Sequence, residues 1–357
     1  MAPWRQLLHE GQVLPALPLA LREDGTWSQE HQRALIRYYM AAGAGGLAVA
    51  VHSTQFAIRE HGLLGPVLSL AATTMDESPD PLIRIAGVCG RTPQAADEAR
   101  LAMDLGYHAA LVSPGAFRDA PEAELLAHLR HIADILPVIG FYLQPAVGGR
   151  VLSYQFWRRF AEIPNIAAVK IAPFNRYQTG EVIRALRDSG RTDIALYTGN
   201  DDAILTDLLT AWPGGAFIAG GLLGQWGVWT RRAVEMLTEV KAVRRACVLP
   251  AAWLTRNAAL TDANAAVFDA ANNFHGCIPG ILEVLRRQGL VPSNRCLDPL
   301  EHLSPGQADE ITRAAAAYPW LTDDDFVQEG LSRWLQPGCQ QSVGSIHSPA
   351  GCDRAVM

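Results

Sequence analysis

The feature that most constrains the fold is a regular alternation of short apolar segments with amphipathic segments over about the first 225 residues. Because the apolar segments lack in/out alternation and helical segments separate them, they predict a parallel sheet covered by helices. Eight such units indicate an α/β fold of the (β/α)8 TIM-barrel type. The eight expected strands are Leu14–Leu21, Gly46–Val51, Leu82–Val88, Ala109–Val112, Pro137–Tyr142, Ile166–Ile171, Ile194–Thr198 and Ala216–Ala219.

Helix start and stop signals lie between these segments. Ser28 has the character of an N-cap for a helix that runs to Ala42, and Thr92-Pro93 opens another. Several of these helices stop at a glycine, as left-handed C-caps require. Further helices are expected at Pro121–Leu136, Ser153–Ile163, Tyr177–Ser189 and Asp201–Trp212, whereas His61–Pro81 resembles an insertion.

The pattern changes to helices alone from about Gly227. This change predicts three parts: a barrel catalytic domain over residues 1–226, a C-terminal helical region over 227–336, and a disordered tail over 337–357 that is rich in Pro, Gly, Ser and Gln. The expected helices of the second part are Val228–Ala246, Pro250–Ala259, Ala263–Asn272, Ile278–Gln288 and Pro305–Tyr318.

Charge and cysteine usage exclude several classes of function. A net charge of −6 and a pI near 5.9 argue against nucleic acid or an anionic membrane as a partner. The sequence has no apolar run of about 18 residues, so we expect no membrane span. The first residues, Met1–Gly11, lack the apolar core of a signal peptide, and the six cysteines form no CxxC pair. These features predict a cytoplasmic protein with reduced thiols and no metal site.

Lys170 is the strongest candidate catalytic residue. It is one of only two lysines among 30 basic residues, and it lies within the apolar strand segment Ile166–Ile171. A lysine in such a segment either extends from a strand end to solvent or is buried with a lowered pKa. The second state suits an amine nucleophile that attacks a carbonyl and forms a Schiff base, which arginine cannot do.

Four segments resemble the dihydrodipicolinate synthase / N-acetylneuraminate lyase family of class I aldolases, from about Val13 to Ala219. Ile163–Lys170 resembles the family's "IPNIVGIK" strand, and Leu136–Pro145 is similar to "LPVILYNVP". Ala109–Pro114 resembles "AALVVPP", and Tyr197–Asp202 resembles the "SGDD" turn. Four matches in order, at the expected separations, make the resemblance specific.

The resemblance implies an enzyme that forms an imine between Lys170 and pyruvate or a related 2-oxo acid. The imine then acts as an electron sink for an aldolase or dehydratase reaction, with no metal or organic cofactor. Tyr142 would relay protons. The resemblance also implies a homotetramer built as a dimer of dimers.

The substrate-reading residues depart from the family pattern. The carboxylate-binding "GTTGE" motif reads Val51–Gln55 here, so that His52, Ser53 and the backbone of the turn at Thr54 would hold the carboxylate. The second relay tyrosine would fall near Gly115 or Ala116, where no hydroxyl exists.

Three other residues remain candidates for contact with the distal part of a substrate. The nearest counterpart of the family's substrate-clamping arginine is Arg150, which could bind a distal carboxylate or hydroxyl. Asn200 and Asp201 lie where relatives that take sugar acids contact hydroxyls. Each has an ordinary alternative, since Arg150 could be an exposed loop residue and the other two could cap the next helix.

Three alternatives stay open at the level of sequence. The first is a metal- or phosphate-dependent barrel in which Lys170 only pairs charges. The second is a catalytically silent family member that senses a keto acid, which the altered "GTTGE" motif and the missing second tyrosine favour. The third is a dihydrodipicolinate synthase-type condensing enzyme with altered specificity.

Overall fold

The computed structural model describes residues 2–246 and 248–337, and within them eight parallel strands form one sheet. The strand order is β1-β8-β7-β6-β5-β4-β3-β2, and a parallel bridge between Ala16 and Ala48 joins the β1 and β2 ends. The strands are β1 (Val13–Pro15), β2 (Gly46–Val49), β3 (Ile83–Val88), β4 (Ala109–Val112), β5 (Val138–Leu143), β6 (Ile166–Ala172), β7 (Ala195–Thr198) and β8 (Gly220–Leu223). The predicted (β/α)8 barrel is therefore confirmed.

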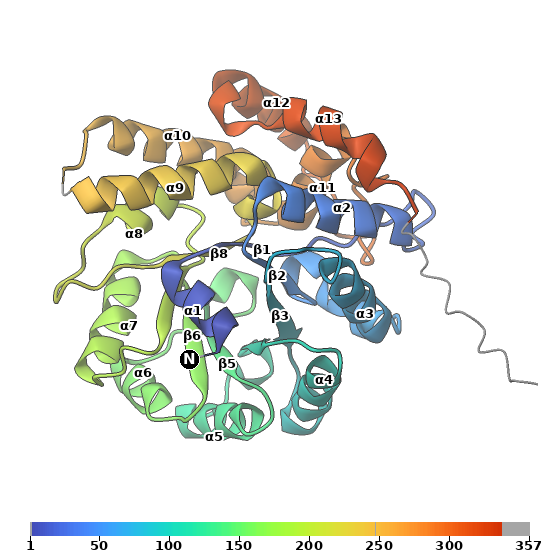
Figure 1. Cartoon of the computed structure of the whole chain (residues 1–357). Helices are drawn as coiled ribbons and strands as arrows, with labels where there is room; N and C mark the ends of the chain where they lie inside the picture. Colours follow the sequence, from blue (N-terminus) through green and yellow to red (C-terminus); the bar gives the residue numbers. More distant parts are fainter. Residues whose placement is uncertain (1, 247, 338–357) are drawn as a thin grey trace, which may run out of the picture.

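Helices surround the barrel and continue beyond it (Figure 1). Those within the barrel repeat are α2 (Gln29–Ala42), α3 (Leu64–Met75), α4 (Thr92–Asp104), α5 (Glu122–Ala133), α6 (Tyr154–Ala161), α7 (Arg176–Asp188) and α8 (Ile204–Leu209). Those that follow are α9 (Thr230–Ala246), α10 (Ala252–Val267), α11 (Cys277–Arg287), α12 (Gln307–Ala317) and α13 (Asp324–Trp334). Ser28 caps α2 as predicted, because its side chain accepts a hydrogen bond from the backbone N–H of His31.

Alternate residues of each strand point to two separate hydrophobic clusters. One set, including Ile85, Leu111 and Phe141, fills the barrel interior, and the other, including Val49 and Val169, packs outward against the helices. Both faces are apolar, which explains why the sequence shows no polar alternation along the strands.

A helix that the sequence analysis missed, α1 (Pro3–Glu10), packs against the interior cluster. Its residues Trp4, Leu7 and Leu8 contact that cluster, and the hydroxyl of Tyr197 in β7 donates to the carbonyl of Leu8. Figure 1 shows α1 in front of the barrel strands. The helix therefore covers the barrel end at which the strands begin.

The predicted eighth strand, Ala216–Ala219, is wrong by one strand length. β8 is Gly220–Leu223, and Ala216 instead pairs with Trp212 in a turn before it. Gly220 and Gly221 look like loop residues because glycine weakens strands. Both are required here, because a side chain at Gly220 would collide with the backbone of Gln12, which leads into β1, and one at Gly221 would collide with the Trp226 ring.

Other differences are local. The supposed insertion His61–Pro81 contains α3, which packs on α2 as an ordinary barrel helix. The two helices expected between Pro250 and Asn272 are one helix, α10, followed by a short 3-10 turn, and α13 was not expected. The predicted tail, apart from Pro337, lies outside the described residues.

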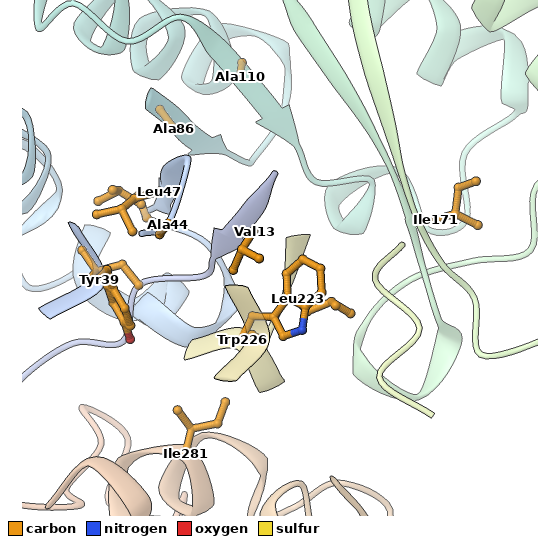
Figure 2. Close-up of a cluster of buried hydrophobic side chains, with 14 of the residues drawn as sticks. Val13, Tyr39, Ala44, Leu47, Ala86, Ala110, Ile171, Leu223, Trp226 and Ile281 are labelled. Carbon is orange, nitrogen blue, oxygen red and sulfur yellow. The ribbon is translucent and has the colours of Figure 1, made fainter. Parts of the chain in front are cut away.

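The C-terminal helices share a hydrophobic core with the barrel. Figure 2 shows Ile281 of α11 near Trp226, in the cluster that also contains Val13 of β1 and Leu223 of β8. The proposed division near residue 226 stays a prediction, because one cluster spans both parts. None of the described helices combines the length and apolar character that crossing a membrane requires.

The close contact at Gly220 can be tested by substitution. We expect Gly220→Ala to lower the free energy of unfolding by about 1–3 kcal/mol, because the added methyl group displaces the Gln12 backbone from its place beside β8. Gly180→Ala in α7 is the matched control. Its methyl group would meet the Trp212 ring at 3.4 Å, an ordinary contact distance, so we expect stability to stay level or rise by up to about 1 kcal/mol. Urea unfolding measures both, and equal stability of the two variants would contradict the prediction.

Candidate active site

A cavity opens at the carboxyl ends of the strands, where (β/α)8 enzymes carry their chemistry. Its volume, including the part open to solvent, is about 680 Å³. Its polar lining comes from strand ends and one helix, and consists of His52, Ser53, Gln144, Lys170, Asp201 and Cys277. Its remaining walls are largely apolar, which is typical of small-molecule sites.

Lys170 points into this cavity from the inner face of β6. Its Nζ lies 4.4 Å from the centre of the Phe141 ring, and its amine makes no hydrogen bond or ion pair with the described residues. The neighbouring strand leaves room for the lysine at Gly199, where an added methyl group would lie 2.6 Å from Lys170 Cε. The sequence therefore places an unpaired amine over an aromatic ring.

Burial lowers the pKa of Lys170 to about 8, and the negative charge of Asp201 opposes that change. Burial also raises the pKa of the Asp201 carboxyl to about 7, although the backbone N–H of Gln225 donates to it at 3.0 Å and favours its charged form. The pKa of His52 falls to about 4, first because of burial and second because of Lys170. His52 is therefore neutral at pH 7.

The turn after β2 brings two of its three candidate residues to the cavity. His52 and Ser53 line it, and the Ser53 hydroxyl is buried without a hydrogen-bond partner among the described residues. Thr54 turns away, because its hydroxyl donates to the carbonyl of Leu17 at 2.6 Å and accepts from the N–H of Val51 at 3.2 Å. Ser53 is thus open to a ligand, whereas the Thr54 side chain holds the turn in place.

Tyr142 does not reach Lys170, so the expectation that it relays protons at this site does not fit the structure. It lies in the outer cluster, with its ring 5.2 Å from that of Trp157. Its hydroxyl bonds to the backbone of Leu152, donating to the carbonyl at 3.4 Å and accepting from the N–H at 3.3 Å. Because successive strand residues point to opposite faces, its neighbour Phe141 is the one beside Lys170.

The sequence itself indicates that Phe141, and not Tyr142, lies beside Lys170. Counted from Leu136-Pro137, the tyrosine of the "LPVILYNVP" pattern falls at Phe141, and reaching Tyr142 requires skipping one residue. The strand position that carries a tyrosine in the pattern therefore has no hydroxyl in this chain.

Two of the three distal candidates are occupied elsewhere. Arg150 donates to the backbone carbonyls of Phe117 and Ala120 and does not line the cavity. Asn200 is buried, and its side chain accepts from the N–H of Phe174 and donates to Thr179 and Asp207. Only Asp201 lines the cavity, so substrate contact by Arg150 and Asn200 does not fit the structure.

Sequence reasoning missed the lining that comes from the loop before α7 and from the C-terminal helices. This group is apolar except for one thiol and consists of Phe174, Phe268, Phe274, Cys277 and Ile281. No local motif distinguishes these residues from ordinary core positions. Their role depends on how α10 and α11 dock over the barrel.

The chain matches the model of the dihydrodipicolinate synthetase family over residues 9–317. It is 32% identical over 196 residues to a 4-hydroxy-tetrahydrodipicolinate synthase of Aromatoleum aromaticum, covering 53% of this chain and 63% of that protein. It is 29% identical to the protein of the same name in Acidothermus cellulolyticus, covering 54% and 60%. The chain thus spans less than two thirds of the length of these relatives.

Solved structures share the fold at low sequence identity. A chloride-inhibited dihydrodipicolinate synthase from Acinetobacter baumannii, complexed with pyruvate, has a TM-score of 0.72 at 19% identity, covering 86% of this chain and 98% of that one. An N-acetylneuraminate lyase from Fusobacterium nucleatum has a TM-score of 0.69 at 18% identity, covering 87% and 99%.

The burial of Lys170 should affect the free energy of unfolding. The folded-state pKa is below the unfolded value, so the cost of holding a charged Lys170 is fully present below pH 8 and disappears as pH rises toward 10.5. We therefore expect Lys170→Met to raise the free energy of unfolding at pH 7 by up to about 3 kcal/mol, with the gain shrinking above pH 8.

Lys241→Met is the matched control. The Lys241 amine donates to the carbonyl of Gly11, so its loss should destabilise the protein by about 1 kcal/mol. Urea unfolding between pH 6 and 10 separates the two, and a Lys170→Met protein that is less stable than the wild type at pH 7 would refute the prediction.

Proposed function

The chain belongs to the dihydrodipicolinate synthetase family, and we propose that it is a class I lyase that acts on pyruvate or a related 2-oxo acid through an imine with Lys170. The single observation that carries the proposal is the unpaired, desolvated amine of Lys170 in a cavity at the carboxyl ends of the strands. An amine with a pKa of about 8 has a substantial neutral fraction near neutral pH, and the neutral amine is the nucleophile.

In the proposed reaction, Lys170 attacks the C2 ketone, and water leaves as the imine forms. The imine then accepts the electron pair of a bond broken at the neighbouring carbon, or supplies an enamine that forms such a bond. Formation and cleavage pass through the same intermediates, so the proposal covers both directions.

Ser53 and His52 are the proposed carboxylate ligands. The Ser53 hydroxyl is buried and has no partner among the described residues, so a ligand oxygen would satisfy it. Neutral His52 lines the same wall and can donate one N–H. Backbone N–H groups of the same turn would donate further hydrogen bonds to the substrate carboxylate.

Asp201 is the proposed proton-transfer group. It faces the same cavity as Lys170, and its carboxyl, with a pKa of about 7, can both donate and accept a proton at neutral pH. This role replaces the tyrosine that the family pattern carries where Phe141 stands. The proposed role of Asp201 in proton transfer differs from the contact with a substrate hydroxyl that the sequence resemblance predicted for it.

A catalytically silent sensor is the second candidate, and Phe141 is the observation that favours it. Without a hydroxyl beside Lys170, an imine could form and then fail to turn over. Such a protein would bind a keto acid and release it unchanged.

Reductive trapping tests the imine. We expect incubation with pyruvate and borohydride to leave a reduced pyruvyl adduct on Lys170, located by peptide mass spectrometry. Lys170→Arg should give no adduct, because a guanidinium stays protonated. Absence of an adduct on the wild type, with pyruvate and with longer 2-oxo acids, would reject the class I mechanism. An adduct without turnover would favour the sensor.

The pH dependence of trapping tests the role of Asp201. The wild-type rate with cyanoborohydride should rise with pH around a midpoint near 8, as Lys170 loses its proton. In Asp201→Asn, loss of the negative charge lowers the pKa of Lys170 further, so the midpoint should fall by about 1 pH unit. Turnover should fall by about 10²–10⁴-fold.

Asp325→Asn is the control for charge, since Asp325 lies exposed on α13 and does not line the cavity. We expect its midpoint and its turnover to match those of the wild type. The same midpoint in Asp201→Asn and the wild type would contradict the assignment.

A further inference from the structure

Aromatic side chains form one apolar wall of the Lys170 cavity. Phe174, from the loop after β6, and Phe274, from the segment before α11, meet with ring centres 5.8 Å apart and planes at 68°. Phe268 and Ile281 extend the same apolar wall. Phe174 and Phe274 are only partly buried, so apolar ring surface faces the cavity.

Both phenylalanines are held in an unfavourable backbone conformation. The φ angle is 53° at Phe174 and 65° at Phe274, in the left-handed region that bulky residues rarely adopt. Such conformations persist only where surrounding structure imposes them, and they cluster at ligand-binding sites.

A buried polar network imposes the first of these conformations. The side-chain oxygen of Asn200 accepts from the N–H of Phe174 at 2.9 Å, and the amide of Asn200 is held in turn by Thr179 and Asp207. Asn200 therefore positions Phe174.

Asp269 imposes the second. Its backbone carbonyl accepts from the N–H of Phe274 at 3.1 Å, and its carboxylate accepts from the N–H of Gly276 at 3.0 Å and from Ser304 at 2.5 Å. Two separate hydrogen-bond networks thus hold the rings of Phe174 and Phe274 against the same cavity.

The side chains of Phe174, Phe268, Phe274 and Ile281 offer no hydrogen-bonding group to a hydrophilic substrate tail. Among the described residues that line the cavity, none is an arginine, and the basic side chains are Lys170 and His52. Arg150 is held by the backbone carbonyls of Phe117 and Ala120 and does not line the cavity. A tail carrying a carboxylate would meet apolar carbon at these four residues and would find no guanidinium in the described lining.

We propose that the substrate carries an aromatic or similarly apolar group beyond C3, so that the enzyme joins pyruvate to an aromatic aldehyde and cleaves the resulting 4-aryl-4-hydroxy-2-oxobutanoate. This inference rests on the proposed lysine-imine function and names its substrate class. Aromatic rings set edge to face around a planar substituent give a favourable contact, and burial of that substituent removes apolar surface from water.

The reaction balances without an oxidant or a cofactor. Lys170 and the C2 ketone of pyruvate form the imine and release water, and C3 loses a proton to give the enamine. C3 then attacks the aldehyde carbon, the new C3–C4 bond forms, and the aldehyde oxygen takes up a proton. Hydrolysis of the product imine consumes one water and restores the amine.

Trapping with two 2-oxo acids of similar length tests the proposal. We expect 4-phenyl-2-oxobutanoate to reach half-maximal adduct on Lys170 at a concentration at least tenfold lower than 2-oxoglutarate. We also expect cleavage of 4-hydroxy-2-oxo-4-phenylbutanoate, followed by release of benzaldehyde, to exceed cleavage of 4-hydroxy-2-oxoglutarate at least tenfold in kcat/KM.

Phe274→Asn tests the wall itself, because asparagine tolerates the left-handed backbone but lacks the ring. The trapping preference for the phenyl acid should fall at least fivefold. Tyr177→Asn removes an aromatic ring that is 89% exposed and does not line the cavity, and should keep the wild-type preference.

The outcomes separate the two proposals. No adduct with either acid or with pyruvate overturns the proposed function itself. Adducts without preference for the phenyl acid, or a preference for 2-oxoglutarate, overturn the aromatic substrate and leave the lysine-imine function standing. If Phe274→Asn increased trapping of both acids equally, the rings would be only a plug over the cavity, and the substrate inference would be rejected.

Discussion

The structure depends on keeping one amine away from water without giving it an ion-pair partner. Lys170 lies over the Phe141 ring and against Gly199, whose missing side chain leaves room for it, and it feels the charge of Asp201 from outside ion-pair distance. Together these neighbours bury the amine and leave it without an ion-pair partner. Burial lowers the pKa of the amine, whereas the charge of the nearby Asp201 carboxyl limits how far it falls.

The barrel supports this arrangement by dividing its strands between two apolar environments. Small inward residues such as Ala168 and Ala172 leave room along β6 for one long side chain, and outward residues such as Val169 and Ile171 fix the strand against the helices. Because the side-chain period is two, the same division that directs Lys170 inward directs Tyr142 outward. The site is thus a direct result of strand register.

The fold and the position of Lys170 could be predicted from sequence because they rest on patterns of many residues. Residues that depend on a single step of register or on distant docking could not. Tyr142 was misplaced by one strand position. The predicted eighth strand ended before β8, because Gly220 and Gly221 resemble loop residues although close packing requires them. Asn200 resembled a ligand contact, yet its partners Thr179 and Asp207 come from α7 and α8.

The contribution of α10 and α11 to the cavity has a consequence for biosynthesis. Lys170 leaves the ribosome about a hundred residues before Phe268, Phe274 and Ile281, and domains generally begin to fold from the N-terminal side. Without α10 and α11 the cavity would lose this apolar wall, and water would reach Lys170, whose lowered pKa comes from burial. A reactive amine therefore requires that the chain be complete through α11.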